Sequence, residues 1–73
     1  MITAEEIKAI LTEKFPGAEV QAEDMTGTQD HFEVIVRWDV FRGMSLIDQH
    51  KKVHQALEMP LEDGRIHALK IKT

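Results

Sequence analysis

Residues 31–38, His31-Phe32-Glu33-Val34-Ile35-Val36-Arg37-Trp38, carry the clearest strand pattern in the chain. The apolar residues of one parity are Phe32, Val34, Val36 and Trp38. Charged Glu33 and Arg37 take the other parity, which is the two-residue period of a half-buried β-strand. A looser alternation over residues 18–25 comes before it, and the polar stretch 26–30 between them contains a glycine. Two such runs joined by a short loop predict a β-hairpin.

Helix signals precede the hairpin. Thr3 and Glu6 have the spacing of a capping box, in which each side chain satisfies a free backbone N–H of the first turn. Apolar residues follow at helical spacing, namely Ile7, Ile10, Leu11 and Phe15. Pro16-Gly17 then ends the predicted helix.

A second helix is expected after the hairpin. Ser45 and Asp48 mark its start, and the helix is predicted over residues 45–58 with Pro60 as its end. One apolar stripe along it is expected from Leu46, Ile47, Val53, Ala56 and Leu57. A short helical turn over residues 61–64 and a last strand over residues 65–72 complete the chain.

The resulting order is helix, strand, strand, helix, short helix, strand. We find no repeat, linker or low-complexity segment, so residues 1–73 are predicted to form a single domain. Interleaved elements of this kind predict an α/β (α+β) fold with a three-stranded mixed sheet and helices packed on one face.

The composition limits the chemistry. The 73 residues include no cysteine, so the chain has no disulfide, no thiolate nucleophile and no cysteine-type metal site of its own. No phosphate loop or nucleophile motif is present, and we therefore expect no enzymatic activity. No apolar run approaches the roughly 20 residues of a membrane span, and no secretory signal begins the sequence. These observations predict a soluble, cytoplasmic protein without membrane contact.

Four histidines are the most informative polar residues. His31 and His67 each begin a predicted strand, where an imidazole nitrogen can remain open at the end of a sheet. Imidazole is the commonest metal ligand in proteins. Two ligands do not complete a four-coordinate site, so a metal here would need a second molecule. The alternative is an ordinary surface or locally hydrogen-bonded role for both histidines.

The charge is unevenly distributed although the net charge is −4. Residues 1–36 hold eight acidic and two basic side chains, whereas residues 37–73 hold five acidic and seven basic ones. An anionic partner would therefore meet the second half of the chain. The candidates for nucleic-acid contact are Lys51, Lys52, Arg65 and Lys70. The alternative is an ordinary solvated surface.

Three stretches of the chain form a recognisable series: Phe41-Arg42-Gly43-Met44-Ser45-Leu46, then a helix with His50 and Leu57, and finally Ile66-His67-Ala68-Leu69. With these motifs the sequence resembles the BolA family, in its histidine type. The resemblance covers nearly the whole chain, including the element order. The resemblance implies a class II KH-like fold. It also implies a monothiol glutaredoxin as partner, acting with glutathione, and a [2Fe–2S] cluster shared between the two proteins and not bound by the isolated chain.

Residue by residue, the resemblance implies that His67 is one cluster ligand. The second ligand of the family lies in the loop between the first two strands, where Asp30-His31-Phe32 matches the histidine type. The position of cysteine in the other type corresponds to Thr28, which cannot replace a thiolate. Two imidazoles in place of thiolates would raise the reduction potential of the cluster and would make its binding sensitive to pH.

His50 matches the histidine of an Arg-His-Arg segment in the family, but Gln49 and Lys51 stand where arginines are usual. Its role is therefore left open. The departure weakens a nucleic-acid role for this helix, and the chain lacks the GxxG loop with which KH modules clamp a backbone.

The sequence thus predicts a BolA-like adaptor that binds a monothiol glutaredoxin and shares a [2Fe–2S] cluster through His31 and His67, in iron sensing or cluster transfer. The alternative is a KH-like nucleic-acid-binding transcriptional regulator that uses the basic helix and the final strand. A weak homodimer of the isolated chain is left open.

Overall fold

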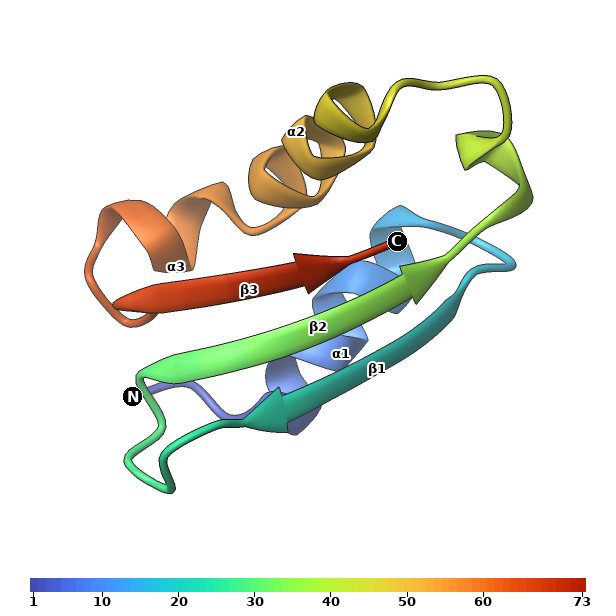
Figure 1. Ribbon diagram of the computed structural model, residues 1–73. Coiled ribbons are helices and arrows are strands. Elements are labelled where there is room, and N and C mark those ends of the chain that lie inside the picture. The colour runs from blue at the N-terminus through green and yellow to red at the C-terminus, as the bar shows by residue number, and fades with distance from the viewer.

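The structure is a computed structural model that describes residues 1–73 (Figure 1). Its elements follow the predicted order, with one additional short turn of 3-10 helix after the hairpin. They are α1 (Ala4–Lys14), β1 (Glu19–Asp24), β2 (His31–Arg37), the 3-10 turn (Asp39–Phe41), α2 (Leu46–Ala56), α3 (Glu58–Glu62) and β3 (Ala68–Lys72). No helix has the length and apolar character needed to cross a membrane.

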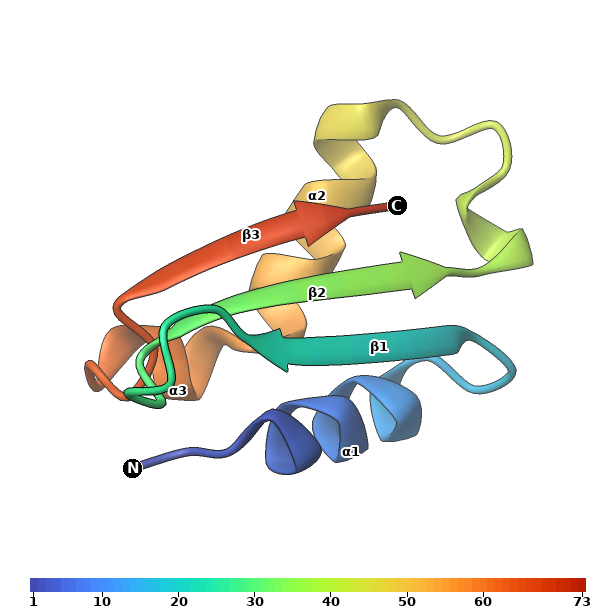
Figure 2. The same cartoon turned by 60° about the horizontal axis from the view of Figure 1, so that its bottom comes forward.

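The three strands form one mixed sheet in the order β1-β2-β3. β1 and β2 are antiparallel, with Val20 opposite Val36, and β2 and β3 are parallel, with His31 opposite Ala68. α1 runs beside β1 and α2 lies beside β3 (Figures 1 and 2). The predicted three-stranded mixed sheet is confirmed.

The helices cover one face of this sheet. Alternate residues of the central strand, Phe32, Val34 and Val36, are at most 1% exposed, as the two-residue period predicts. They belong to a core of 12 buried residues, to which α1 contributes Ile7 and Leu11, α2 contributes Val53, and the junction between α2 and α3 contributes Leu57. The opposite face is polar, and there Glu33 lies between Lys70 and Lys72 at 3.7 and 3.8 Å.

Both predicted helix starts are confirmed. The Thr3 hydroxyl accepts a hydrogen bond from the backbone N–H of Glu6, and the Glu6 carboxylate accepts one from the N–H of Thr3. Ser45 accepts a hydrogen bond from the N–H of Asp48 at 3.1 Å. These bonds satisfy N–H groups that have no partner within the helix.

The structure corrects the sequence reading of the second helix. Leu46 and Ile47 are 62% and 69% exposed, so they do not join the apolar stripe that reaches the core through Val53 and Leu57. α2 ends at Ala56, before Pro60, which is buried inside α3. Proline is tolerated there because the first turn of a helix needs no intrahelical N–H donor.

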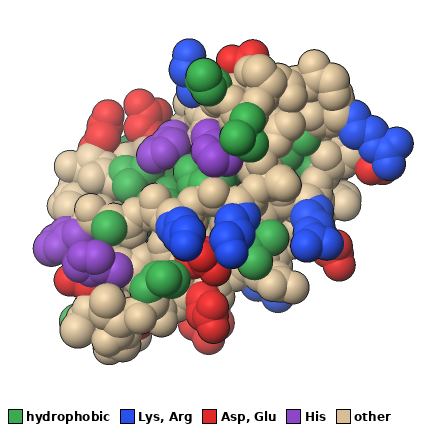
Figure 3. Space-filling model, viewed as in Figure 1, with side chains coloured by type: hydrophobic (Ala, Val, Ile, Leu, Met, Phe, Trp, Pro, Cys, Tyr) green, Lys and Arg blue, Asp and Glu red, His purple; other side chains and the backbone are tan.

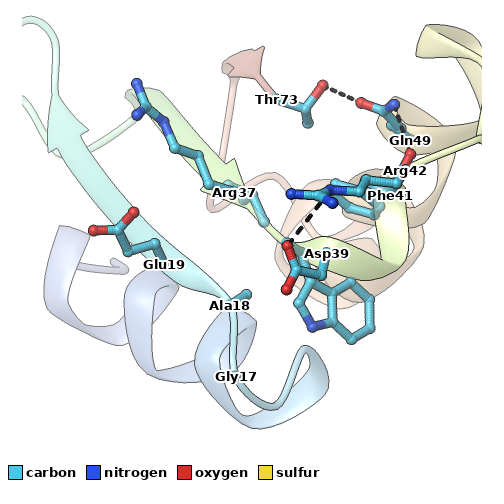
Figure 4. Close-up of a pocket in the computed structure, with 11 residues that line it drawn as sticks. Gly17, Ala18, Glu19, Arg37, Asp39, Phe41, Arg42, Gln49 and Thr73 are labelled. Carbon is cyan, nitrogen blue, oxygen red and sulfur yellow. Dashed lines mark hydrogen bonds and ion pairs between the residues drawn. The ribbon is translucent and has the colours of Figure 1, made fainter.

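Three aromatic rings close the end of the sheet at which β2 finishes. The Phe15 ring centroid lies 4.8 Å from that of Trp38 and 5.9 Å from that of Phe41. The Trp38 indole N–H donates a hydrogen bond to the carbonyl of Pro16 at 2.9 Å. Trp38 and Phe41 therefore pack against each other and against Phe15. A concave pocket of about 570 Å³ adjoins this cluster (Figure 4). Trp38, Phe41 and Gly17 are among the residues that line it.

Candidate metal centre

His31 and His67 lie side by side because of the parallel pairing of β2 and β3. His31 is the first residue of β2 and is paired with Ala68, the first residue of β3, so His67 immediately precedes that pair. The carbonyl of Asp30 accepts hydrogen bonds from the backbone N–H groups of His67 and Ala68, at 2.7 and 3.2 Å. The ladder thus extends one step beyond the strands and fixes the backbone of both histidines.

The two imidazole rings lie edge to face at the surface. Their centroids are 6.3 Å apart and their planes meet at 76°. The side chains are 46% and 61% exposed for His31 and His67 respectively. Figure 3 shows histidine side chains at the edge of the molecule where β2 and β3 begin. A partner can therefore approach both rings at once.

A carboxylate lies against both rings on their Nδ1 side. The Asp30 Oδ1 is 2.8 Å from Nδ1 of His31, and its Oδ2 is 3.6 Å from Nδ1 of His67. Thr28 also donates a hydrogen bond to Oδ1. The hydrogen bond from Thr28, followed by that from His31, lowers the pKa of Asp30 to about 2; burial opposes this shift, and the charges of His31 and His67 add smaller lowering effects. Asp30 is therefore an anion at neutral pH.

The loop that carries Asp30 is held by a second carboxylate. Asp24, at the end of β1, accepts hydrogen bonds from the backbone N–H groups of Thr26, Gly27 and Gln29 at 3.0–3.2 Å. Gln29 has a φ of 59°, in the left-handed region that non-glycine residues seldom adopt. The N–H of Met25 also donates to the carbonyl of His31 at 2.8 Å. These hydrogen bonds hold the loop that leads from β1 into His31.

The chain brings two imidazoles, His31 and His67, together at this end of the sheet. No group of three or more histidine, cysteine, aspartate or glutamate side chains is arranged to hold a metal ion. Two neutral imidazoles suit iron, zinc or copper, and they replace two thiolates in one class of [2Fe–2S] centre. The two imidazoles therefore fit two of the four ligand positions of such a cluster.

The other two histidines lie on α2, and Figure 3 shows a second group of histidine side chains over this helix. His54 is exposed, whereas His50 is half-buried and its Nε2 has no hydrogen-bond partner in the protein. Beside it, Gln49 donates to the carbonyls of Phe41 and Met44 at 3.1 and 2.9 Å. Glutamine at this position thus ties the start of α2 to the preceding turn.

The four basic residues considered for nucleic-acid contact do not form one surface. Lys51 and Lys52 are exposed on α2, in the helical layer. Lys70 lies on the opposite, open face of the sheet and pairs with Glu33. Arg65 is held by Asp63 at 2.9 Å. Lys51 and Lys52 thus lie on a different face of the domain from Lys70.

Sequence reasoning missed Asp30 and Asp24 as parts of the site. The sequence places Asp24 in the predicted strand over residues 18–25 and Asp30 in the polar stretch 26–30. The available signal was the pair Asp30-His31, because histidines that bind metals commonly donate their second ring N–H to a carboxylate. Nothing local indicates that Asp30 also reaches His67, since that contact depends on strand register.

Fold and site together define a small α/β domain that presents a pair of histidines at one exposed end of its sheet, where β2 and β3 begin. The family model described as BolA-like protein matches residues 11–73. Protein RP812 of Rickettsia prowazekii is 40% identical over 72 residues, which cover 99% of this chain and 92% of that protein. Protein BOLA2 of Arabidopsis thaliana is 37% identical over 73 residues, covering 99% and 76%.

The solved structure of the BolA domain of SufE1 from Arabidopsis thaliana superimposes with a TM-score of 0.83 at 27% identity, covering 94% of this chain and 86% of that one. The chain belongs to the BolA-like protein family. Its mixed three-stranded sheet with three helices is the fold of that family.

Proposed function

We propose that this protein is an adaptor that binds a monothiol glutaredoxin and shares a [2Fe–2S] cluster with it through His31 and His67. The observation that carries the proposal is the pair of exposed imidazoles 6.3 Å apart at the start of β2 and β3. Membership of the BolA-like family supports it. A cluster of this kind needs four ligands, and this chain offers two.

The chain's own contribution is to hold two neutral imidazoles at a fixed spacing. When bound, the cluster would supply redox and iron chemistry, and the glutaredoxin thiolate and glutathione would complete its ligands. The backbone bonds of Asp30 to His67 and Ala68 set the spacing, and the exposure of both rings leaves room for the partner. Because ligation requires an unprotonated ring nitrogen, acidification is expected to release the cluster from this chain.

The cluster would serve as cargo or signal, passed on or sensed, and this chain would act without catalysing a reaction. An adaptor role is consistent with the absence of a third ligand at the site, since a half-site releases its cargo when the partner departs. Iron sensing and cluster transfer are both compatible with such a half-site.

The test is to mix the chain with a cluster-loaded monothiol glutaredoxin and glutathione, and to follow visible absorption and circular dichroism. The wild type should change both spectra, because the two imidazoles replace two thiolate ligands of the cluster. His67→Ala and His31→Ala should each abolish the change. His54→Ala is the matched control, because it removes an exposed histidine far from the pair. An unchanged spectrum with the wild type would contradict the proposal.

A further inference from the structure

Asp30 is the one side chain that contacts both candidate ligands. Its Oδ1 lies 2.8 Å from Nδ1 of His31, which is a hydrogen-bond distance. Its Oδ2 lies 3.6 Å from Nδ1 of His67, which is an ion-pair distance beyond a hydrogen bond. Both contacts involve Nδ1, so both rings turn the same nitrogen toward the carboxylate.

This geometry determines which ring nitrogen is free. A neutral imidazole carries one N–H and one nitrogen with a lone pair. An ionised carboxylate only accepts hydrogen bonds, so it favours the tautomer with the proton on Nδ1. Free histidine in water prefers the opposite tautomer. With Nδ1 protonated, the lone pair of Nε2 points away from Asp30 and is available to a metal.

The backbone and the side chain of Asp30 have separate roles. Its carbonyl accepts from the N–H groups of His67 and Ala68, and thereby joins the ends of β2 and β3. Its carboxylate contacts the two rings and Thr28. A substitution that changes only the carboxylate therefore leaves the bonds that place the two histidines side by side.

We propose that Asp30 is a positioning residue for the histidine pair: its carboxylate orients both rings and holds their Nε2 atoms ready for a metal. This role rests on the proposed ligation by His31 and His67. The shorter contact predicts a stronger effect on His31 than on His67. A carboxylate partner also makes an imidazole more basic, so Asp30 is expected to lower the reduction potential of a cluster bound at the pair.

The first test needs neither a cluster nor a partner. Nitrogen NMR of the ¹⁵N-histidine-labelled protein, at a pH where the rings are neutral, reports the tautomer of each ring. In the wild type, His31 should be mainly in the Nδ1–H form, and His67 should show the same preference to a smaller degree. A wild-type His31 mainly in the Nε2–H form overturns the proposal without any variant.

The second test uses Asp30→Asn, which keeps the shape of the side chain and removes its charge. Because an amide can present either oxygen or NH₂ to the ring, the Nδ1–H preference of His31 should be lost. Uptake of cluster from the loaded glutaredoxin should weaken by on the order of 10-fold or more, and the reduction potential of the bound cluster should rise.

Asp24→Asn is the matched control. It removes a carboxylate from the same loop, but one that contacts only backbone N–H groups and neither ring. It should leave both tautomers as in the wild type. If it changes them as much as Asp30→Asn does, loop order rather than the Asp30 carboxylate sets the tautomer, and the positioning role is wrong.

The two proposals fail in different ways. If the wild type takes up cluster while Asp30→Asn shows the same tautomers and the same uptake, the positioning role is wrong and the ligation stands. If the wild type takes up no cluster, the proposed ligation is wrong whatever the tautomers are.

Discussion

The two ends of the β2–β3 pair are built in opposite ways. At the end where β2 finishes, Phe15, Trp38 and Phe41 pack ring against ring beside the largest concavity of the molecule. At the end where both strands begin, His31 and His67 stand half exposed at an edge. One end buries aromatic surface, and the other presents two exposed imidazoles.

The difference teaches where to look for function in a small domain. The concave pocket is lined by a mixture of opposite charges, such as Arg42 and Asp39 at 3.8 Å, with no convergent ligand set (Figure 4). The histidine end has two side chains of one kind, and one carboxylate contacts both of their rings. A site that is completed by a partner needs convergent ligands at an accessible edge more than it needs a cavity.

The largest effect on folding is expected at the aromatic end. Phe41→Ala removes a ring that is 5% exposed and touches both other aromatic rings. The free energy of unfolding should fall by about 3 kcal/mol, as for other buried phenylalanine truncations. Urea denaturation followed by far-UV circular dichroism measures it. A loss below about 1 kcal/mol would show that this end is not a structural anchor.

A smaller loss is expected from Trp38→Phe. The change keeps an aromatic ring and removes the indole N–H that donates to the Pro16 carbonyl. The free energy of unfolding should fall by about 1 kcal/mol, the net value of one such hydrogen bond. The same urea experiment measures it, and uptake of cluster should stay at the wild-type level. Impaired uptake with intact folding would show that the aromatic end affects cluster binding, and would contradict the separate roles of the two ends.

The histidine edge should show the reverse pattern. His67→Ala changes a side chain that is 61% exposed, so the free energy of unfolding should move by no more than about 0.5 kcal/mol. Cluster uptake should nevertheless be lost. Thermal and urea unfolding measure the first quantity. A large destabilisation would mean that the imidazole pair has a structural role.

The smallest effect concerns acid stability. The folded protein lowers the pKa of Asp30 to about 2 from its ordinary value of 3.8, so its carboxylate stabilises the fold above that ordinary value. This contribution is lost as pH falls through about 2. The difference in unfolding free energy between the wild type and Asp30→Asn should therefore shrink over this acid range. A difference that grows with acidification contradicts the assigned contacts.

Much of the fold was predictable because its signals are local. The alternation in residues 31–38 gave the central strand and its buried face, and Thr3 and Ser45 marked the two helix starts. The exposure of Leu46 and Ile47 was not predictable, since helical spacing alone does not show which part of α2 reaches the core.

The site was predictable only in part. The positions of His31 and His67 at strand starts follow from the pattern, and their role as ligands was implied by family resemblance. Their proximity depends on the parallel register that sets His31 opposite Ala68, which no local pattern specifies. The contact of Asp30 with His67 has the same origin.

The most direct measurement is pulsed EPR on the reduced cluster complex formed with a monothiol glutaredoxin, with ¹⁵N-histidine in this chain alone. Strong hyperfine couplings arise only from nitrogens that are bonded directly to the paramagnetic iron pair. The account predicts couplings from two labelled imidazoles in the wild type and in His54→Ala, whereas His31→Ala and His67→Ala should form no cluster complex with coupling to labelled histidine. A stable complex whose cluster shows no coupling to labelled histidine would contradict it.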